Sequence, residues 1–168
     1  MSSMSKEDIK NKNRELCERF PFLIPHDCFT GEVYPDYDYE YTELDDMPDG
    51  WRKAFGEQMC QEIMDELVAN KMVDEYRVVQ IKEKFGGLRW YDNGFTQKGF
   101  DIINKYENLS YKTCIACGKP ATRMTKGWIM PFCDECCPAG NYDPIATDEY
   151  DAYQDEMAGV AEQEAAWV

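Results

Sequence analysis

Cys114-Ile-Ala-Cys117 and Cys133-Asp-Glu-Cys136 are two Cys-x-x-Cys motifs separated by fifteen residues, and they form the most specific pattern in this chain. Two residues between cysteines allow one tight turn to present both thiolates to the same ion. Fifteen residues are enough for a strand, a turn and a returning strand. We therefore predict a zinc ribbon in which Cys114, Cys117, Cys133 and Cys136 hold one Zn²⁺ ion.

The expected role of this zinc is structural. Four thiolates fill a tetrahedral coordination sphere and leave no position for water or substrate. The only histidine, His26, lies far away in the sequence. Cys137 directly follows Cys136 and is a second candidate partner for Cys133, but Cys136 keeps the same two-residue spacer in both motifs. Redox chemistry and plain buried thiols are the alternatives to metal binding.

The residues inside and just before the ribbon are expected to form short strands and a helix. Within the ribbon, Gly127-Trp128-Ile129 is expected in the returning strand, with Trp128 shielding the metal. Upstream, residues 76–91 predict a β-hairpin, because Gly86-Gly87 can supply positive φ at both turn positions. Residues 95–109 then predict a helix that leads into the ribbon.

Residues 81–91, Ile-Lys-Glu-Lys-Phe-Gly-Gly-Leu-Arg-Trp-Tyr, are followed by a cysteine ribbon that begins at Thr113. This combination resembles small uncharacterised proteins of bacteria and their phages that join such a hairpin to a four-cysteine ribbon. The resemblance extends from about residue 20 to residue 136. It implies an architecture and a phage or mobile-element setting, and it transfers no catalytic residue.

The N-terminal half predicts two helices. Ser5 and Asp8 form a capping-box pattern ahead of a helix over residues 6–18, and residues 20–25, which contain two prolines, are expected to dock as an irregular strap. The stronger helix is expected over residues 51–70 with Asp49 as its N-cap. Its apolar residues recur at every fourth position. They are Trp51, Phe55, Met59, Ile63 and Leu67.

Between these helices, the tyrosines at positions 37, 39 and 41 alternate with acidic residues. Alternation with period two predicts an edge strand or extended loop whose tyrosines cover the core. The alternative is an acidic, aromatic contact surface, because tyrosine supplies rigid contact area and carboxylates steer the encounter with a basic protein.

Together these patterns predict one α+β protein, in which a small antiparallel hairpin packs on one long amphipathic helix, with a C-terminal zinc ribbon and an acidic tail. The expected boundaries are 1–110 for the α+β core, 111–138 for the ribbon and 139–168 for a helical or mobile tail. No apolar run reaches the ~20 residues that a membrane span needs, and no secretory signal is evident, so a cytoplasmic location is expected. The scattered Cys17, Cys28 and Cys60 are expected as free thiols.

The formal net charge of −15 is unevenly distributed. Residues 32–49 contain eight acidic residues and no Lys or Arg, and residues 138–168 contain eight more, again with none. The rest of the chain is close to neutral, and residues 71–126 carry an excess of basic residues. This segregation favours a protein partner with a basic surface.

The sequence shows no nucleophile paired with a base, no phosphate-binding glycine loop and no open metal site, so we expect that this protein is not an enzyme. The alternative is a metal-dependent nuclease that uses the acidic residues near positions 34–46. We expect a non-catalytic protein that binds a basic, nucleic-acid-handling host protein, as a phage-encoded inhibitor of host defence would. No membrane partner is expected. The candidate contact residues are Asp36, Tyr37, Asp38, Tyr39, Glu40, Asp148, Glu149 and Asp151.

A nucleic-acid-binding regulator is the alternative function. Lys and Arg side chains pair with phosphates while aromatic rings stack on bases. The overall charge of −15 opposes this alternative, because it repels phosphate at long range. The candidate residues in the hairpin and ribbon are Lys82, Lys84, Arg89, Trp90, Lys119, Arg123 and Lys126.

Overall fold

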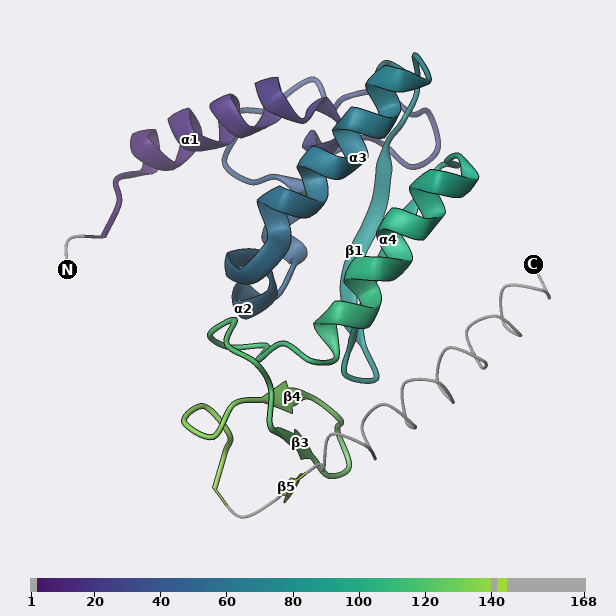
Figure 1. Ribbon diagram of the computed structural model, residues 1–168. Coiled ribbons are helices and arrows are strands. Elements are labelled where there is room, and N and C mark those ends of the chain that lie inside the picture. Colours follow the sequence, from purple (N-terminus) through teal and green to yellow (C-terminus); the bar gives the residue numbers. More distant parts are fainter. Residues whose placement is uncertain (1–2, 140–141, 145–168) are drawn as a thin grey trace.

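The computed structural model describes residues 3–139 and 142–144, and it places helices and a β-hairpin above a small ribbon that carries the cysteines (Figure 1). The acidic residues Asp148, Glu149 and Asp151 lie outside the described residues. No helix in the described part of the chain has the length and apolar character needed to cross a membrane. The helices are α1 Lys6–Arg19, α2 Asp49–Trp51, α3 Glu57–Ala69 and α4 Gln97–Ser110, and the strands are β1 Val78–Lys84, β2 Gly87–Asp92, β3 Arg123–Thr125, β4 Pro131–Phe132 and β5 Tyr142–Pro144.

Helix α1 begins with the expected capping box. The Asp8 amide donates to the Ser5 hydroxyl over 3.1 Å, and the Asp8 carboxylate accepts from the Ser5 amide and hydroxyl. These bonds satisfy backbone donors that the first helical turn leaves open. After the helix, the strap folds into a short 3₁₀ turn over Pro21–Leu23, in which Phe22 and Leu23 are fully buried.

The helix expected over residues 51–70 is divided into three consecutive segments: α2, a π-helical turn over Arg52–Gly56, and α3. All five apolar side chains of the four-residue repeat are buried. In a regular α-helix, residues four positions apart differ in direction by about 40° around the helix axis. The wider π turn rotates the opposite way, and this keeps Trp51 and Phe55 on the same side as the α3 residues. Asp49 is not the N-cap, because the helix already begins there and Pro48 occupies the cap position.

The hairpin forms, but its turn is one residue earlier than expected. Phe85 and Gly86 are the two turn residues, with φ of 54° and 83°, and Gly87 is already paired with Lys84 as the first residue of β2. Gly87 is needed for a different reason. A Cβ atom at this position would lie 2.2 Å from the ring of Tyr111, so only glycine lets that ring approach the strand.

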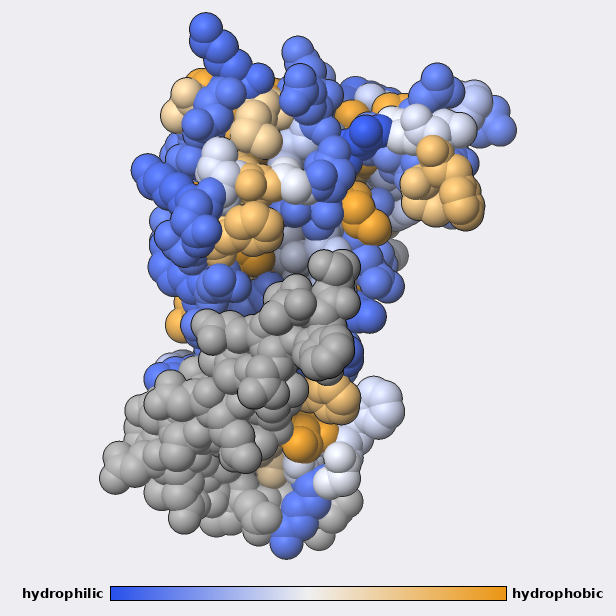
Figure 2. Space-filling model, turned by 90° about the vertical axis from the view of Figure 1, so that its right-hand side faces the viewer, coloured by the Kyte–Doolittle hydropathy of each residue, from blue (hydrophilic) through white to orange (hydrophobic). Residues whose placement is uncertain are grey.

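The inner face of the hairpin completes the main core. Ile81, Leu88 and Trp90 are buried together with apolar residues of α3 and α4, so the sheet packs on two helices rather than one (Figure 1). Helix α4 begins after Thr96, whose hydroxyl accepts from the Gly99 amide over 2.9 Å. The α+β class is therefore confirmed. On the face that Figure 2 shows, the helices and the hairpin are mainly hydrophilic with separate apolar patches.

The tyrosine-rich stretch is not an edge strand. Residues 35–36 form a turn, residues 39–40 form a bend, and Tyr39 adopts a left-handed conformation with φ of 66°, which breaks the extended backbone. The rings of Tyr37 and Tyr39 lie 4.8 Å apart, and the Tyr37 hydroxyl donates to the Tyr41 carbonyl over 2.5 Å. Asn13 of α1 donates to the Tyr39 carbonyl. These local and helix contacts replace the sheet hydrogen bonds that a strand would need.

Candidate metal centre

The four cysteines predicted as ligands come together in one cluster. The Sγ atoms of Cys114, Cys117, Cys133 and Cys136 all lie within 4.8 Å of one another, and those of Cys117 and Cys133 are 3.6 Å apart. An ion bound at about 2.3 Å from four sulfurs in a tetrahedron sets them about 3.8 Å apart. The cluster is therefore suited to a metal ion.

Each Cys-x-x-Cys motif forms the same kind of turn. The Gly118 amide donates to the Cys114 carbonyl over 3.0 Å, and the Cys137 amide donates to the Cys133 carbonyl over 3.1 Å. Cys137 thus occupies the position after the second turn that Gly118 occupies after the first. Its backbone closes the turn, and its thiol is outside the four-sulfur group.

Short strands connect the two turns. The Ile115 amide donates to the Pro131 carbonyl, the Thr122 amide donates to the Phe132 carbonyl, and β3 pairs with β4. The returning strand is β4, not the Gly127-Trp128-Ile129 segment, which lies in the turn before it. Strand β5 pairs with the other edge of β3 and lies beyond the expected end of the ribbon at residue 138.

The first cysteine turn is attached to the start of the helical core. The Gly50 amide donates to the Ile115 carbonyl over 2.9 Å, and the buried Trp51 indole donates to the Thr113 carbonyl over 2.9 Å. A Cβ atom on Gly50 would lie 2.2 Å from the Cys114 carbonyl oxygen, so this contact requires glycine. Sequence reasoning did not identify the contact. Glycine is unfavourable in a helix, so its presence in the first turn is the one sign in the sequence that another segment packs closely there.

Hydrogen bonding and crowding separate the thiol pKa values. Burial raises the pKa of Cys114, but the N–H groups of Cys133, Cys117 and Ala116 outweigh burial and bring it down to about 7. Hydrogen bonds to Cys133 and Cys117 raise the pKa of Cys136 to about 12. A cation at the centre would stabilise all four thiolates and so lower the pKa of Cys136 as well.

Trp128 does not shield the cluster. Its side chain is 73% exposed and lies in the turn between β3 and β4. The apolar cover comes instead from Phe132, Ile115 and Met130, which pack against the cysteines. Local composition predicts Trp128 in the returning strand, whereas its exposure depends on where that strand begins, which is at Pro131.

The basic residues predicted for nucleic-acid contact are only partly available. Lys82 and Arg89 are cross-strand partners in the hairpin. Trp90 is not a contact residue, because it is buried and its indole donates to the Tyr76 hydroxyl over 3.0 Å. Arg123 forms an ion pair of 2.9 Å with Asp134, and Lys119 forms one of 3.3 Å with Glu135. Lys126 is exposed in the β3–β4 turn.

The acidic residues near positions 34–46 do not converge on a cation site. In the part of the chain that the structure describes, the four cysteines are the one group of His, Cys, Asp or Glu ligands placed to hold a metal. Asp36, Asp38 and Glu40 are exposed, and Asp38 accepts from Lys10 over 2.9 Å. This hydrogen bond lowers the pKa of Asp38.

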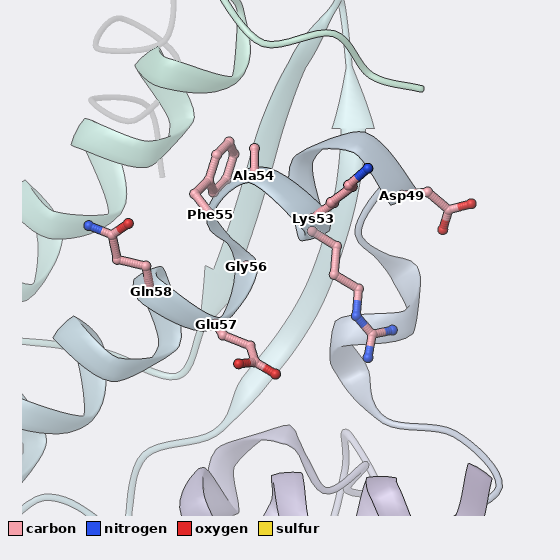
Figure 3. Close-up of a pocket in the computed structure, with 8 residues that line it drawn as sticks. Asp49, Lys53, Ala54, Phe55, Gly56, Glu57 and Gln58 are labelled. Atoms are coloured by element: carbon pink, nitrogen blue, oxygen red, sulfur yellow. The ribbon is translucent and has the colours of Figure 1, made fainter. Parts of the chain in front are cut away.

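A shallow pocket of about 430 Å³ lies at the π-helical turn (Figure 3). Asp49 and Gln58 point away from each other, and Phe55 points to the side opposite Glu57 (Figure 3). Asp49 and Gln58 therefore do not meet at one point, as the groups of a catalytic site must.

No protein-family model, curated protein or solved structure matches the chain.

Proposed function

We propose that this protein is a non-catalytic, zinc-stabilised binding protein, and that its acidic segment, residues 32–49, contacts a basic surface on a nucleic-acid-handling protein. One observation carries the proposal: seven of the eight acidic residues of the acidic segment are exposed at the surface. The exposed residues are Glu32, Asp36, Asp38, Glu40, Asp45, Asp46 and Asp49.

Zinc is the ion that best suits the cysteine cluster. Thiolate ligands select soft or borderline ions, and four sulfurs in a tetrahedral arrangement favour zinc or iron. The Cys-x-x-Cys spacing at both ends is typical of structural zinc sites. With all four positions taken by sulfur, the ion holds the ribbon together and supplies no reactive water.

Buried side chains attach the acidic segment to the core and hold its charges in place. Thr42, Leu44 and Met47 are buried, and the 3₁₀ turn Glu43–Asp46 packs against β1. The Thr42 amide donates to the Asp45 carboxylate over 2.7 Å, which fixes the start of that turn. A fixed charge array loses little conformational entropy when a partner binds.

The surface combines charge with rigid contact area. Tyr34 and Tyr41 are exposed among the carboxylates. Carboxylates attract a basic surface over several ångströms and raise the association rate, whereas tyrosines provide close contact after the encounter. Only Lys10 and Arg52 form ion pairs with acidic-segment carboxylates among the described residues, so most of the segment's negative charge remains available.

The resemblance to bacterial and phage proteins suggests the setting. A phage product with a fixed acidic surface could occupy a groove that a host defence enzyme uses for DNA or RNA. Acidic side chains then take the place of phosphates, and the host enzyme is blocked by competition rather than by chemistry.

The test is capture of partners from a lysate of the host bacterium with the full chain. The variant Glu32→Gln/Asp36→Asn/Asp46→Asn removes three charges and leaves the ion pairs of Lys10 and Arg52 in place. The matched control is Asp65→Asn/Asp74→Asn/Glu75→Gln, which removes the same charge from exposed positions elsewhere.

We expect a basic partner that the wild type and the control capture, that the acidic-segment variant loses, and that rising salt releases. Equal capture by both triple variants would show that the acidic segment is not the contact surface.

A further inference from the structure

The two faces of the β-hairpin carry different chemistry. The register pairs Ile81 with Trp90 on the inner face, where both are buried in the core. It pairs Lys82 with Arg89 on the outer face, to which Lys84 also belongs because side chains alternate along a strand. The outer face therefore carries three cations on two short strands.

Lys82 and Lys84 are placed where the protein itself gains little from them, whereas Arg89 donates to the Leu88 carbonyl and to the Tyr111 hydroxyl, each over 2.9 Å. Like charges directly opposite each other in a sheet are destabilising. Within residues 3–139 and 142–144, no ion pair involves Lys82, Lys84 or Arg89. Two carboxylates of the hairpin and the ribbon have other partners. Glu83 accepts from the Gly86 amide, and Asp134 pairs with Arg123.

Glu107 is the acidic group that acts on Arg89 from helix α4. Burial raises the pKa of Glu107 to about 7, against the lowering effect of Arg89. Near neutral pH this carboxyl therefore offsets only part of the Arg89 charge.

Each cation of the outer face lies beside an aromatic ring. Lys82 Nζ is 5.4 Å from the centre of the Tyr91 ring, and Lys84 Nζ is 5.4 Å from the centre of the Phe85 ring. Tyr91 and Phe85 are themselves exposed. Rings for base stacking and cations for phosphates are thus interleaved on one surface.

The ribbon extends this surface. A Cβ atom on Gly86 would lie 3.1 Å from both Cγ2 and the carbonyl oxygen of Ile129, so the hairpin turn touches the turn between β3 and β4 (Figure 1). Trp128, the residue before Ile129, is 73% exposed, and Phe85, the residue before Gly86, is 54% exposed. On the described part of the ribbon, apolar residues reach the surface beside hydrophilic ones (Figure 2).

Phe85 breaks a local rule. Its φ of 54° is left-handed, a conformation that costs a non-glycine residue about 1–2 kcal/mol. The side chain is exposed and adds nothing to the main core. Strained residues of this kind cluster at functional sites, where the surrounding structure holds them in place.

We infer that this hairpin–ribbon face, consisting of Lys82, Lys84, Phe85, Arg89, Tyr91, Lys126 and Trp128, binds single-stranded nucleic acid. The inference goes beyond the proposed protein partner and uses none of the acidic segment. The cations complement phosphates, and the exposed rings complement unpaired bases. A duplex is a poorer fit, because its bases are already stacked and offer no free faces to the rings.

The test is fluorescence anisotropy of a labelled oligothymidylate of about 20 nucleotides, longer than the ~4–16 nucleotides that one small binding fold covers. The full chain is titrated at several NaCl concentrations from about 50 to 200 mM. The charge variant is Lys82→Ala/Lys84→Ala, and its control is Lys6→Ala/Lys12→Ala, two exposed lysines of α1.

Loss of two phosphate contacts should reduce the slope of log affinity against log salt by about 1.4, and the control should leave it unchanged. Trp128→Ala should weaken binding at least about fivefold without changing the slope, the lower end expected for one stacked base. The aromatic control is Phe29→Ala, which removes a 95% exposed ring from another loop.

The variant Phe85→Asn distinguishes loss of a binding contact from loss of folding. Asn-Gly is the preferred pair for a turn with two positive φ values, so this variant should fold at least as stably as wild type and still bind oligothymidylate more weakly. The inference is overturned if the full chain does not bind at about 50 mM NaCl. It is also overturned if duplex DNA binds more tightly than the single strand, or if the hairpin–ribbon variants match their controls. None of these outcomes bears on the acidic segment, whose test uses different residues.

Discussion

At the metal centre, the residue after each Cys-x-x-Cys turn has a backbone role. Gly118 and Cys137 both donate their amide to the carbonyl of the first cysteine of the motif. Serine supplies the same amide as cysteine, so replacing Cys137 should leave the turn intact. This distinguishes Cys137 from the four clustered thiols, each of which would supply one of the four metal–sulfur bonds.

We therefore predict one zinc per chain in the wild type and in Cys137→Ser, and less than one in Cys136→Ser. Loss of one thiolate leaves an incomplete coordination sphere and weakens binding. Metal content after dialysis, measured by mass spectrometry, checks this. Full zinc in Cys136→Ser together with loss in Cys137→Ser would show that the second turn uses the other cysteine.

Gly50 provides a second prediction at the residue scale. In an ordinary helix, Gly→Ala stabilises by about 0.5–1 kcal/mol. At Gly50 the new Cβ would overlap the Cys114 carbonyl, so Gly50→Ala should instead destabilise the protein by about 1–3 kcal/mol. Urea unfolding measures the change.

The matched control is Gly56→Ala, because the side chains near that position, Arg52 and Met47, are flexible. Gly56→Ala should leave the free energy of unfolding unchanged or raise it slightly. Equal effects at the two positions would mean that the attachment of the ribbon to the helix is not as close as the structure has it.

Glu107 gives a pH-dependent prediction. Burial raises its pKa from 4.5 to about 7 in the folded state. The unfolded chain loses this proton at lower pH, so the wild type should lose stability as pH rises from about 4.5 to 7, by about 1.4 kcal/mol for each pKa unit of the shift. Glu107→Gln removes this loss.

The variant should therefore exceed wild type in stability at pH 8 and not at pH 4. Thermal unfolding at both pH values measures it, with the exposed Glu75→Gln as the control. A constant difference between wild type and Glu107→Gln across this range would mean that the carboxyl is already ionised in the folded protein below pH 5.

At the scale of elements, the ribbon and the helical part have separate apolar cores. The main core joins the helices and the hairpin, whereas the ribbon buries Phe132 against its cysteines and Met124 against Tyr111, and its strands are two or three residues long. So small a core cannot offset the entropy of ordering the chain, and we expect metal binding at the cysteine cluster to supply the difference.

Chelation should therefore unfold the ribbon while most of the helical signal in circular dichroism remains. The indole N–H resonance of Trp51 in NMR reports on the contact between the parts, because its hydrogen bond to the Thr113 carbonyl should be lost. Simultaneous loss of the helices and the ribbon would show that the two unfold as one unit. Hydrolytic activity that disappears on chelation without any structural change would contradict a structural role for the metal.

At the scale of the whole molecule, the features that could be predicted were those with local causes. The cysteine spacing, the four-residue apolar repeat and the capping box each depend on residues close in sequence, and each is found in the structure. Features set by distant contacts were missed. Gly50 matters because of Cys114, Gly87 because of Tyr111, and the exposure of Trp128 depends on where β4 begins.

The net charge of −15 makes a final prediction about the two proposed surfaces together. Exposed charges act over about 10 Å at 0.1 M salt, so carboxylates of the acidic segment should repel nucleic acid even where they do not touch it. Glu32→Gln/Asp36→Asn/Asp46→Asn should slow association with the captured basic partner and tighten oligothymidylate binding. Lys82→Ala/Lys84→Ala should weaken oligothymidylate binding and leave the partner's association rate unchanged or faster.

Stopped-flow association and anisotropy on the same four proteins, the two variants and their two controls, measure both effects. If each variant weakens binding of its own ligand only, the acidic segment and the hairpin–ribbon face have separate ligands. Both effects should shrink together as salt rises, because both depend on unscreened charge. If the acidic-segment variant tightens oligothymidylate binding and leaves the partner's association rate unchanged, the segment acts as an electrostatic shield for the hairpin–ribbon face rather than as a contact surface.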